Sequence, residues 1–120
     1  MKVAFTTSDG TTVDRHFGQV SQFHVWDVEA DKAAFVGTVD AITAGDEEER
    51  TSARANAVAG CAIVYTVQIG GPAAAKLVAR RIHPMKTGAE IPVADAIARL
   101  QGVLRGTPPP WLRKALAGEP

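Results

Sequence analysis

The sequence predicts an α/β protein in which helices pack on a mixed five-stranded sheet. Three observations lead to this class. Apolar stretches of strand length come first along the chain, helical patterns then alternate with strands, and the most apolar strand lies between two helices. A hairpin adds antiparallel strands to a sheet, whereas strand–helix–strand units add parallel ones. The predicted order is three strands, followed by helix and strand in alternation and a last helix.

The first three predicted strands occupy the N-terminal third of the chain. Residues 2–7 (KVAFTT) form the first strand, which ends at the turn signal of residues 8–10 (SDG). Residues 11–21 are predicted to be a loop. Apolar side chains alternate in residues 22–28 (QFHVWDV), so this strand has at least one buried face. A tight connection leads to its hairpin partner, residues 33–39 (AAFVGTV).

The middle of the chain contains a helix and the central strand. The helix begins near Gly45 and carries three glutamates in its first turn, where the helix dipole favours negative charge. Gly60 marks its end as a left-handed cap residue. Residues 61–67 (CAIVYTV) form a continuous apolar strand of the type found at the centre of a sheet.

The last third alternates again and ends in a proline-rich tail, which starts at about residue 106. Gly70-Gly71-Pro72 opens a helix over residues 72–81. The short strand 82–86 contains Pro84, which places it at a sheet edge. A helix over residues 92–105 has one apolar face, and residues 107–110 lead to a short amphipathic turn, WLRKAL. The residues expected to be buried in the 92–105 helix are Val93, Ala96, Ile97, Leu100, Val103 and Leu104.

Length and composition indicate one soluble domain over residues 1–120. Apolar residues make up 46% of the chain and charged residues 22%, as in ordinary globular proteins. The 13 Lys and Arg residues balance 13 Asp and Glu residues, so no nucleic-acid partner is expected. No apolar run approaches the roughly 20 residues of a membrane helix, and no signal peptide is seen. A single cysteine, Cys61, excludes an internal disulfide and fits a cytoplasmic location.

The loop VDRHFGQ, residues 13–19, holds the first candidate site. Loops on rigid scaffolds carry function more often than regular elements do. Gly18 allows a bulky ligand to approach the backbone, and Asp14 is placed to orient the imidazole of His16. His16 is therefore a candidate ligand, and an ordinary surface histidine is the alternative.

The turn Gly70-Gly71-Pro72 is a second candidate site. Unpaired amides at the start of a helix favour anions. Lys76, one turn into the helix, and Arg15, across the end of the sheet, are expected to add positive charge. The alternative is an ordinary turn between a strand and a helix.

Three other residues of ligand type have structural interpretations. His24 lies on a strand between apolar neighbours, where a structural role is expected. His83 precedes Pro84 at the end of a strand, and a role as a surface or capping residue is expected for it. Cys61 begins the central strand, and a free cysteine is among the most often buried residue types.

Several motifs in order resemble the NifX family of nitrogenase cofactor-biosynthesis proteins, which includes NafY, NifY and the C-terminal part of NifB. They are the TSDG turn, VDRHFGQVSQFHVWDV with its D-x-HFG, CAIVYTVQIGGPAAAKLV, and the segment from RIHPMK to PPPWLRKAL. The resemblance covers nearly the whole chain. D-x-HFG by itself is a weak signal, but the motifs together are specific.

The resemblance implies a ribonuclease-H-like fold and a single dinitrogenase iron-molybdenum cofactor-binding domain. It implies a non-enzymatic carrier that binds an iron–sulfur precursor of the cofactor, or the cofactor itself, and passes it between the assembly proteins NifB and NifEN. The cluster-binding histidine of the HFG motif corresponds to His16. Arg15, Phe17 and Gly18 surround it in the motif, and Cys61 and His83 are carried as further candidate ligands.

A prefabricated cluster explains why one histidine is sufficient. Its irons are already coordinated by sulfide, so it needs only one or two protein ligands. Such a sparse ligand set also permits release to a recipient. Because the cluster is anionic, backbone amides, Arg15 and Lys76 are expected to add attraction.

Two alternative functions fit the same fold. A nuclease needs carboxylates that converge on metal ions, and Asp9, Asp14 and Asp27 are the available candidates. The chain lacks GxxxxGK[ST], GxGxxG, HExxH and GxSxG, so no enzymatic activity is predicted. The second alternative function is a regulatory module that binds only protein. Trp111 and the proline-rich tail either pack on the core or dock a partner.

Overall fold

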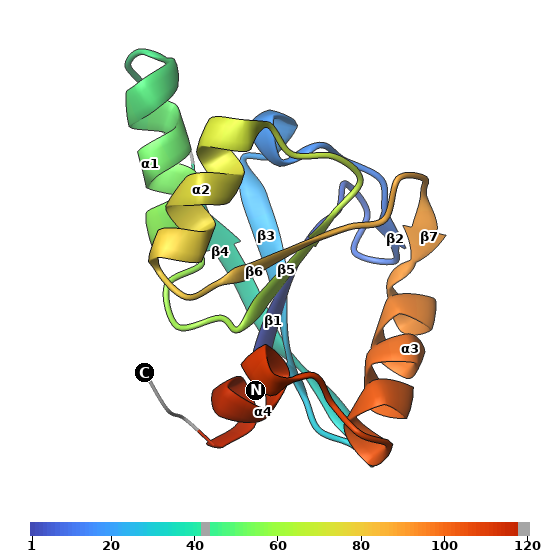
Figure 1. The fold of residues 1–120 in the computed structure, drawn as a ribbon. Coiled ribbons are helices and arrows are strands. Elements are labelled where there is room, and N and C mark those ends of the chain that lie inside the picture. Colours follow the sequence, from blue (N-terminus) through green and yellow to red (C-terminus); the bar gives the residue numbers. More distant parts are fainter. Residues whose placement is uncertain (42–43, 118–120) are drawn as a thin grey trace.

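The centre of the molecule is a five-stranded mixed sheet, described in a computed structural model for residues 1–41 and 44–117. The strand order is β4-β3-β1-β5-β6 (Figure 1). Of these five strands, β3 alone runs antiparallel to the others. The predicted α/β class and mixed five-stranded sheet are thereby confirmed. The strands are β1 (Lys2–Thr6), β3 (Gln22–Val28), β4 (Ala33–Asp40), β5 (Ile63–Thr66) and β6 (His83–Lys86).

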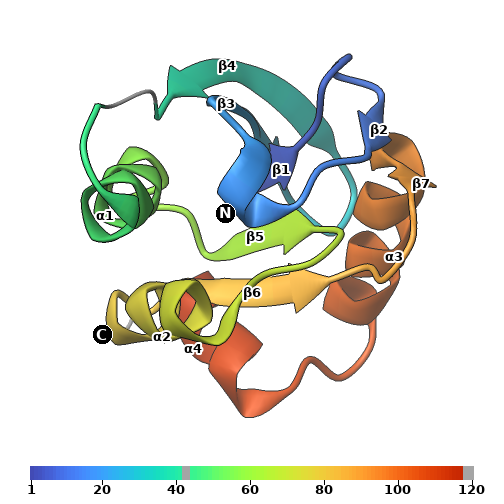
Figure 2. The same ribbon diagram turned by 90° about the horizontal axis from the view of Figure 1, so that it is seen from above.

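Helices cover both faces of this sheet (Figure 2). On one face, α1 (Glu47–Ala57) and α2 (Gly71–Ala79) enclose a cluster that includes Phe17, Phe23 and Leu77. On the other face, α3 (Val93–Arg105) and Leu112 of α4 (Pro110–Ala117) complete a second cluster. β6, at the edge where Pro84 placed it, lies beside α2 and α4. No helix among the described residues is long and apolar enough to cross a bilayer.

Two elements within the predicted 11–21 loop escaped the sequence analysis. β2 (Thr12–Val13) pairs with β7 (Ile91–Pro92) in a separate two-stranded sheet, and η1 (Phe17–Gln19) is a 3₁₀ turn. Strands of two residues are too short to show a period, and the two partners are far apart in sequence. The pairing therefore needed the tertiary fold to bring them together.

Several boundaries differ from the predicted ones for local physical reasons. The side chain of Asp46 accepts a hydrogen bond from the N–H of Glu49 and caps α1 at its start. α1 ends at Ala57, and Gly60 adopts its left-handed conformation, with φ of 86°, in the turn that follows. Val103, predicted to be buried in α3, is 42% exposed, so that prediction was wrong.

The C-terminal segment forms a helix rather than the predicted short turn. α4 begins at Pro110, the position where proline fits a helix well. Leu112 is 1% exposed and belongs to the core cluster beneath α3. Burial of this side chain gives the helix the tertiary support that a segment so short needs in water.

Candidate functional site

The loop that carries Arg15 and His16 is fixed at the carboxyl ends of β1 and β5. The carbonyl oxygen of Arg15 accepts hydrogen bonds from the N–H of Val67 at 3.1 Å, from the hydroxyl of Thr6 at 2.8 Å and from that of Thr66 at 3.1 Å. The Thr66 hydroxyl shares its single proton with the carbonyl of Gln68, which lies 3.0 Å away. Thr6 and Thr66 are fully buried. Ligands of open α/β sheets bind outside the carboxyl ends of the strands, so this loop is rigidly held at a suitable place.

Phe17 attaches the same loop to the core of the protein. Its N–H donates to the carbonyl of Gln68 at 2.9 Å, and its ring lies 5.7 Å from that of Phe23, measured between centroids. The side chain is only 1% exposed. The ring therefore faces the core, and Phe17 also lines the pocket that Gly18 borders, so its contact with a ligand stays a prediction. Its contribution is to hold the neighbouring His16 in place.

His16 is exposed and begins the 3₁₀ turn. Its N–H donates to Oε1 of Gln19 at 3.2 Å, and its carbonyl accepts from the N–H of Gln19 at 3.0 Å. Asp14 forms no hydrogen bond with the imidazole within the described residues; its two carboxylate oxygens accept from Ser8, one from the N–H at 2.9 Å and one from the hydroxyl. The prediction for Asp14 was wrong, since that side chain closes the preceding turn.

The two predicted parts of the site meet at one pocket. Gly18 of the loop and Gly70 of the turn both line a pocket of about 410 Å³ between η1 and the first turns of α1 and α2. Gly71 is the first residue of α2, and Pro72 follows it. Apart from the adjoining residues of the chain, no atom lies within 4 Å of the position that a Cβ would take on Gly18 or Gly70, so the space beside both glycines is open. The fold thus joins segments that are distant in the sequence.

The charge of this pocket differs from the expected one. Lys76 does not offer a free cation, because its Nζ lies 2.6 Å from Oε1 of Glu48 and ties α2 to α1. Glu47 and Glu48 both line the pocket. Arg15, in contrast, is exposed and forms no ion pair with any described residue. Arg15 is therefore the cation beside His16 that is available to an anion.

Cys61 and His83 lie at the other end of the sheet from His16. Cys61 precedes β5, whereas the His16 loop is bonded beyond the end of that strand. His83 pairs in register with Ile63, the first residue of β5. At about 3.3 Å per residue, the strand separates both from the loop by roughly 15–20 Å. They do not share a ligand set with His16, and the described residues contain no group of three or more metal-ligating side chains.

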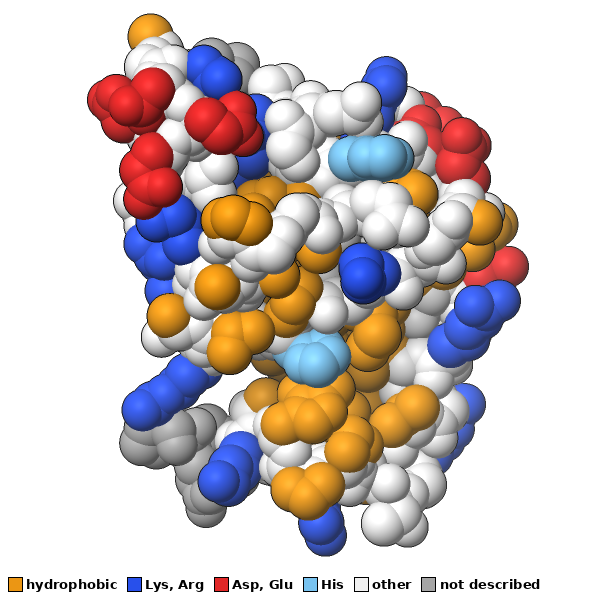
Figure 3. Space-filling view, turned by 45° about the horizontal axis from the view of Figure 1, so that its top comes forward, with side chains coloured by type: hydrophobic (Ala, Val, Ile, Leu, Met, Phe, Trp, Pro, Cys, Tyr) orange, Lys and Arg blue, Asp and Glu red, His pale blue; other side chains and the backbone are white. Residues whose placement is uncertain are grey.

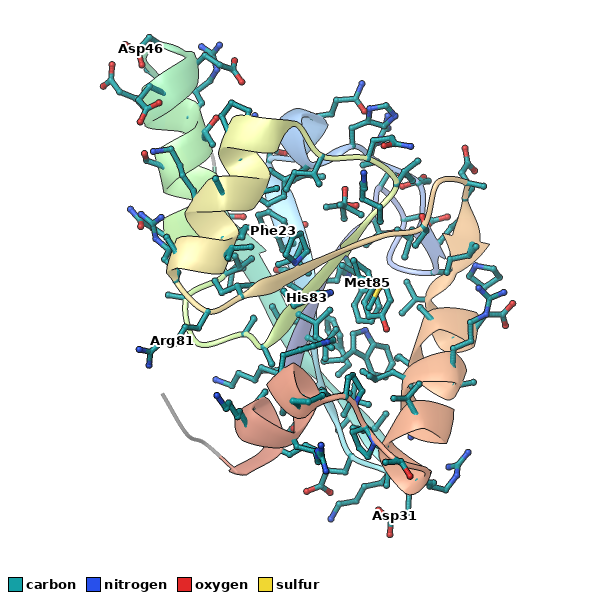
Figure 4. All side chains as sticks on the ribbon, in the orientation of Figure 1. Phe23, Asp31, Asp46, Arg81, His83 and Met85 are labelled. Atoms are coloured by element: carbon teal, nitrogen blue, oxygen red, sulfur yellow. The ribbon has the colours of Figure 1, made fainter. Side chains whose placement is uncertain are left out.

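Both residues also have environments that fit a structural role. Cys61 is 6% exposed, and burial raises the pKa of its thiol to about 11. His83 stacks on Trp111 with ring centroids 3.9 Å apart and planes 12° from parallel. Burial lowers the pKa of His83, so the neutral ring is favoured. Figure 4 shows His83 on β6 in the space above α4.

The three carboxylates considered for a nuclease do not converge. Asp9 accepts from the N–H groups of Thr11 and Thr12, both at 2.9 Å, and these bonds lower its pKa to about 2. Asp14 is bonded to Ser8, as described above. Asp27 lies at the opposite end of β1, 3.1 Å from the N-terminal amine. These carboxylates close turns and hold the chain terminus.

The threonine pair that holds Arg15 was missed by the sequence analysis. Thr6 and Thr66 each end an apolar strand, in FTT and YTV respectively. A polar residue at the last buried position of two central strands is a usable signal, because a buried hydroxyl needs a partner. The identity of that partner depends on the fold.

Comparison with known proteins shows the family of this chain. The dinitrogenase iron-molybdenum cofactor family matches residues 1–102. A NifX protein of Herbaspirillum seropedicae is 42% identical over 97% of this chain and 82% of its own length. The chain belongs to the NifX family. Membership of this family supports a role in the biosynthesis of the nitrogenase iron–molybdenum cofactor.

Other relatives agree with this membership. A NifX protein of Sinorhizobium fredii is 36% identical over 98% of this chain and 78% of its own length. NifY of Azotobacter vinelandii is 32% identical over all of this chain and 50% of its own length. The crystal structure of PH0822 has the same fold, with a TM-score of 0.69 at 24% identity, and covers 85% of this chain and 91% of its own. The family match ends before α4.

Proposed function

We propose that this NifX-family chain is a non-enzymatic carrier of an iron–sulfur precursor of the nitrogenase iron–molybdenum cofactor. One observation carries the proposal: His16 is exposed on a loop that three hydrogen bonds to Arg15 fix at the carboxyl ends of β1 and β5. A fixed loop positions one imidazole without the cost of ordering it on binding. The cluster is cargo, and its sulfides satisfy most of its iron sites, so His16 is sufficient as the metal ligand.

We infer the position of the cargo around His16 from the neighbouring charges. An anionic cluster is attracted by the free guanidinium of Arg15, whereas Glu47 and Glu48 of the neighbouring pocket are paired with Arg50 and Lys76 and leave no free cation from these pairs there. We therefore place the cargo over Arg15, His16 and Gly18. Gly70, Gly71 and the ion-paired Lys76 then contribute less than the sequence suggested.

The proposal includes the setting of this activity. NifB and the NifEN scaffold are the assembly proteins between which the cargo would pass, in the cytoplasm, and residues 1–120 would act as one domain. We also infer that the sheet is ribonuclease-H-like. The order β4-β3-β1-β5-β6 with one antiparallel strand supports this classification.

The direct test is cluster retention by wild type and by His16→Ala under anaerobic conditions. The isolated iron–sulfur precursor is added, unbound cluster is removed by gel filtration, and protein-bound iron is measured. We expect at least a tenfold loss of affinity for His16→Ala. Because His16 is exposed, its replacement should change the free energy of unfolding by no more than about 0.5 kcal/mol.

His83→Ala and Cys61→Ala are the matched controls, since both residues lie at the other end of the sheet. Unchanged retention by these two variants, with loss in His16→Ala, supports the proposal. Equal retention by all three would place the ligand elsewhere. A wild-type protein that stays colourless and iron-free but binds assembly proteins would favour the alternative, a regulatory module without cluster binding.

A further inference from the structure

Two pockets flank the stacked His83 and Trp111 along the outer side of β6. One, of about 310 Å³, lies between the end of α2 and α4, and the other, of about 520 Å³, lies between β6 and α3. His83 and Trp111 line both pockets. The two pockets adjoin at this stacked pair and are together named the β6 groove. It is defined by Val78, Arg81 and Lys114 on one side of the pair and by Met85, Lys86, Arg99 and Val103 on the other.

The β6 groove has apolar walls. Val78 of α2 is 60% exposed and Val103 of α3 is 42% exposed, and these are among the few large apolar side chains exposed to this degree. Figure 3 shows hydrophobic side chains across the middle of this face, around a histidine. Exposed apolar surface that is continuous over several elements marks a site of interaction.

The charged residues of the groove are all cations. Arg81 and Lys114 line the first pocket, Lys86 and Arg99 line the second, and no Asp or Glu lines either. None of these four cations forms an ion pair with a described residue, whereas Lys76 and Arg50 elsewhere do. On this face the acidic side chains lie near the upper corners, away from the hydrophobic middle (Figure 3). The chain has no net charge, so this concentration is local.

Arg81 occupies a position where glycine is the usual residue. Its φ is 60°, the one positive value for a non-glycine residue in residues 1–41 and 44–117. The left-handed conformation carries a steric cost for residues with a Cβ. An arginine here lines the first pocket in spite of that cost, with its side chain directed outward from His83 in Figure 4.

We propose that the β6 groove binds an acidic, amphipathic segment of a partner protein. The segment places one apolar side chain in each pocket, on either side of His83 and Trp111, and its carboxylates face the two pairs of cations. Charge complementarity of this kind selects partners and speeds their association. The site uses neither His16 nor the cluster, so it does not depend on the proposed carrier function.

The distribution of the cations favours a segment over a compact anion. They belong to four different parts of the fold: the end of α2, β6, α3 and α4. A small anion needs donors that converge on one point, whereas here each pocket offers two cations and apolar walls. A bilayer is less suitable, because its surface does not enter a groove.

Peptide selection on the whole protein tests this proposal. Random 16-residue peptides displayed on phage are selected on the immobilised chain, synthesised, and titrated by fluorescence anisotropy at low and high salt. We expect the recovered peptides to be acidic with at least two apolar residues, and to bind less tightly at high salt. Lys114→Glu and Arg99→Glu should each weaken binding by about tenfold.

Arg113→Glu is the matched control, since Arg113 is exposed on the same helix as Lys114 but does not line the groove. It should change affinity by less than twofold. Three results would overturn the proposal. They are failure to recover any peptide, recovery of peptides without acidic residues, and an affinity that Lys114→Glu and Arg99→Glu leave unchanged. So would a dimer in gel filtration, or sedimentation with phosphatidylglycerol vesicles, if the same two substitutions abolished it. Cluster retention through His16 is a separate readout, so failure here leaves the carrier function untouched.

Discussion

Replacing the threonine pair beneath Arg15 is the sharpest test of how the fold holds His16. The changes are Thr6→Val, Thr66→Val and the double variant. Both hydroxyls lie within hydrogen-bond distance of the Arg15 carbonyl, at 2.8 and 3.1 Å, inside the protein. Valine is isosteric with threonine but lacks the hydroxyl, so the substitution removes the hydrogen bond without opening a cavity.

The expected magnitude follows from the number of donors that share one acceptor. A buried hydrogen bond contributes about 1 kcal/mol net, so each single variant should lose about 1 kcal/mol. In each single variant the Arg15 carbonyl keeps the other hydroxyl and the N–H of Val67. The double variant leaves only the N–H, so its loss should exceed the sum of the two single losses by about 0.5 kcal/mol or more.

Urea unfolding measures these differences. With an m-value near 2 kcal/mol/M, a total loss of about 2.5 kcal/mol lowers the midpoint by a little more than 1 M. Amide hydrogen exchange at Phe17 and Val67 should accelerate in the double variant, because the loop opens more often. Thr38→Val, on the exposed strand β4, is the control and should be near neutral. Strictly additive losses, or unchanged exchange, would refute the shared-acceptor reasoning.

The remaining predictions concern Cys61, the His83–Trp111 stack and the Lys76–Glu48 ion pair. Iodoacetamide should alkylate Cys61 slowly at pH 8, because the thiol is buried and protonated. The free energy of unfolding should fall as pH rises from about 9 to about 11, because only the folded state keeps the thiol protonated in that range. A free energy of unfolding that does not change with pH in this range would contradict burial of the thiol. Trp111→Ala should cost about 2 kcal/mol and raise the pKa of His83 back toward 6.5, followed by NMR titration. In wild type, burial favours the neutral imidazole, so stability should fall as pH drops below 6.5, and this fall should weaken in the variant. Lys76→Ala should cost less than about 1 kcal/mol in thermal melts, since Glu48 is 72% exposed; a larger loss would mean that the pair is desolvated.

The regular elements of this fold were predictable because their signals are local. The continuous apolar run of residues 61–67 identified the central strand, and Pro84 placed β6 at the edge. In contrast, β2 and β7 hold only two residues each, and Val103 lies on a helix face whose exposure depends on what packs there. Neither could be read from spacing.

Some features of the candidate site were likewise visible in the sequence, whereas others depend on tertiary packing. The HFG motif and the Gly70-Gly71 turn were visible as motifs, and the fold does bring Gly18 and Gly70 to one pocket. The pairing of Lys76 with Glu48 was not visible, because it joins two helices whose packing is tertiary. The same holds for the burial of the Phe17 ring.

The sequence by itself determined the α/β class, the strand and helix order, and the motifs that show NifX-family membership. These follow from periodicity and residue type, which act over a few neighbours. Only the tertiary structure decided which charges are free and which are paired, and that His83 stands apart from His16 beside an apolar groove. Charge pairing and burial depend on distances between segments remote in sequence, and those distances exist only once the chain has packed.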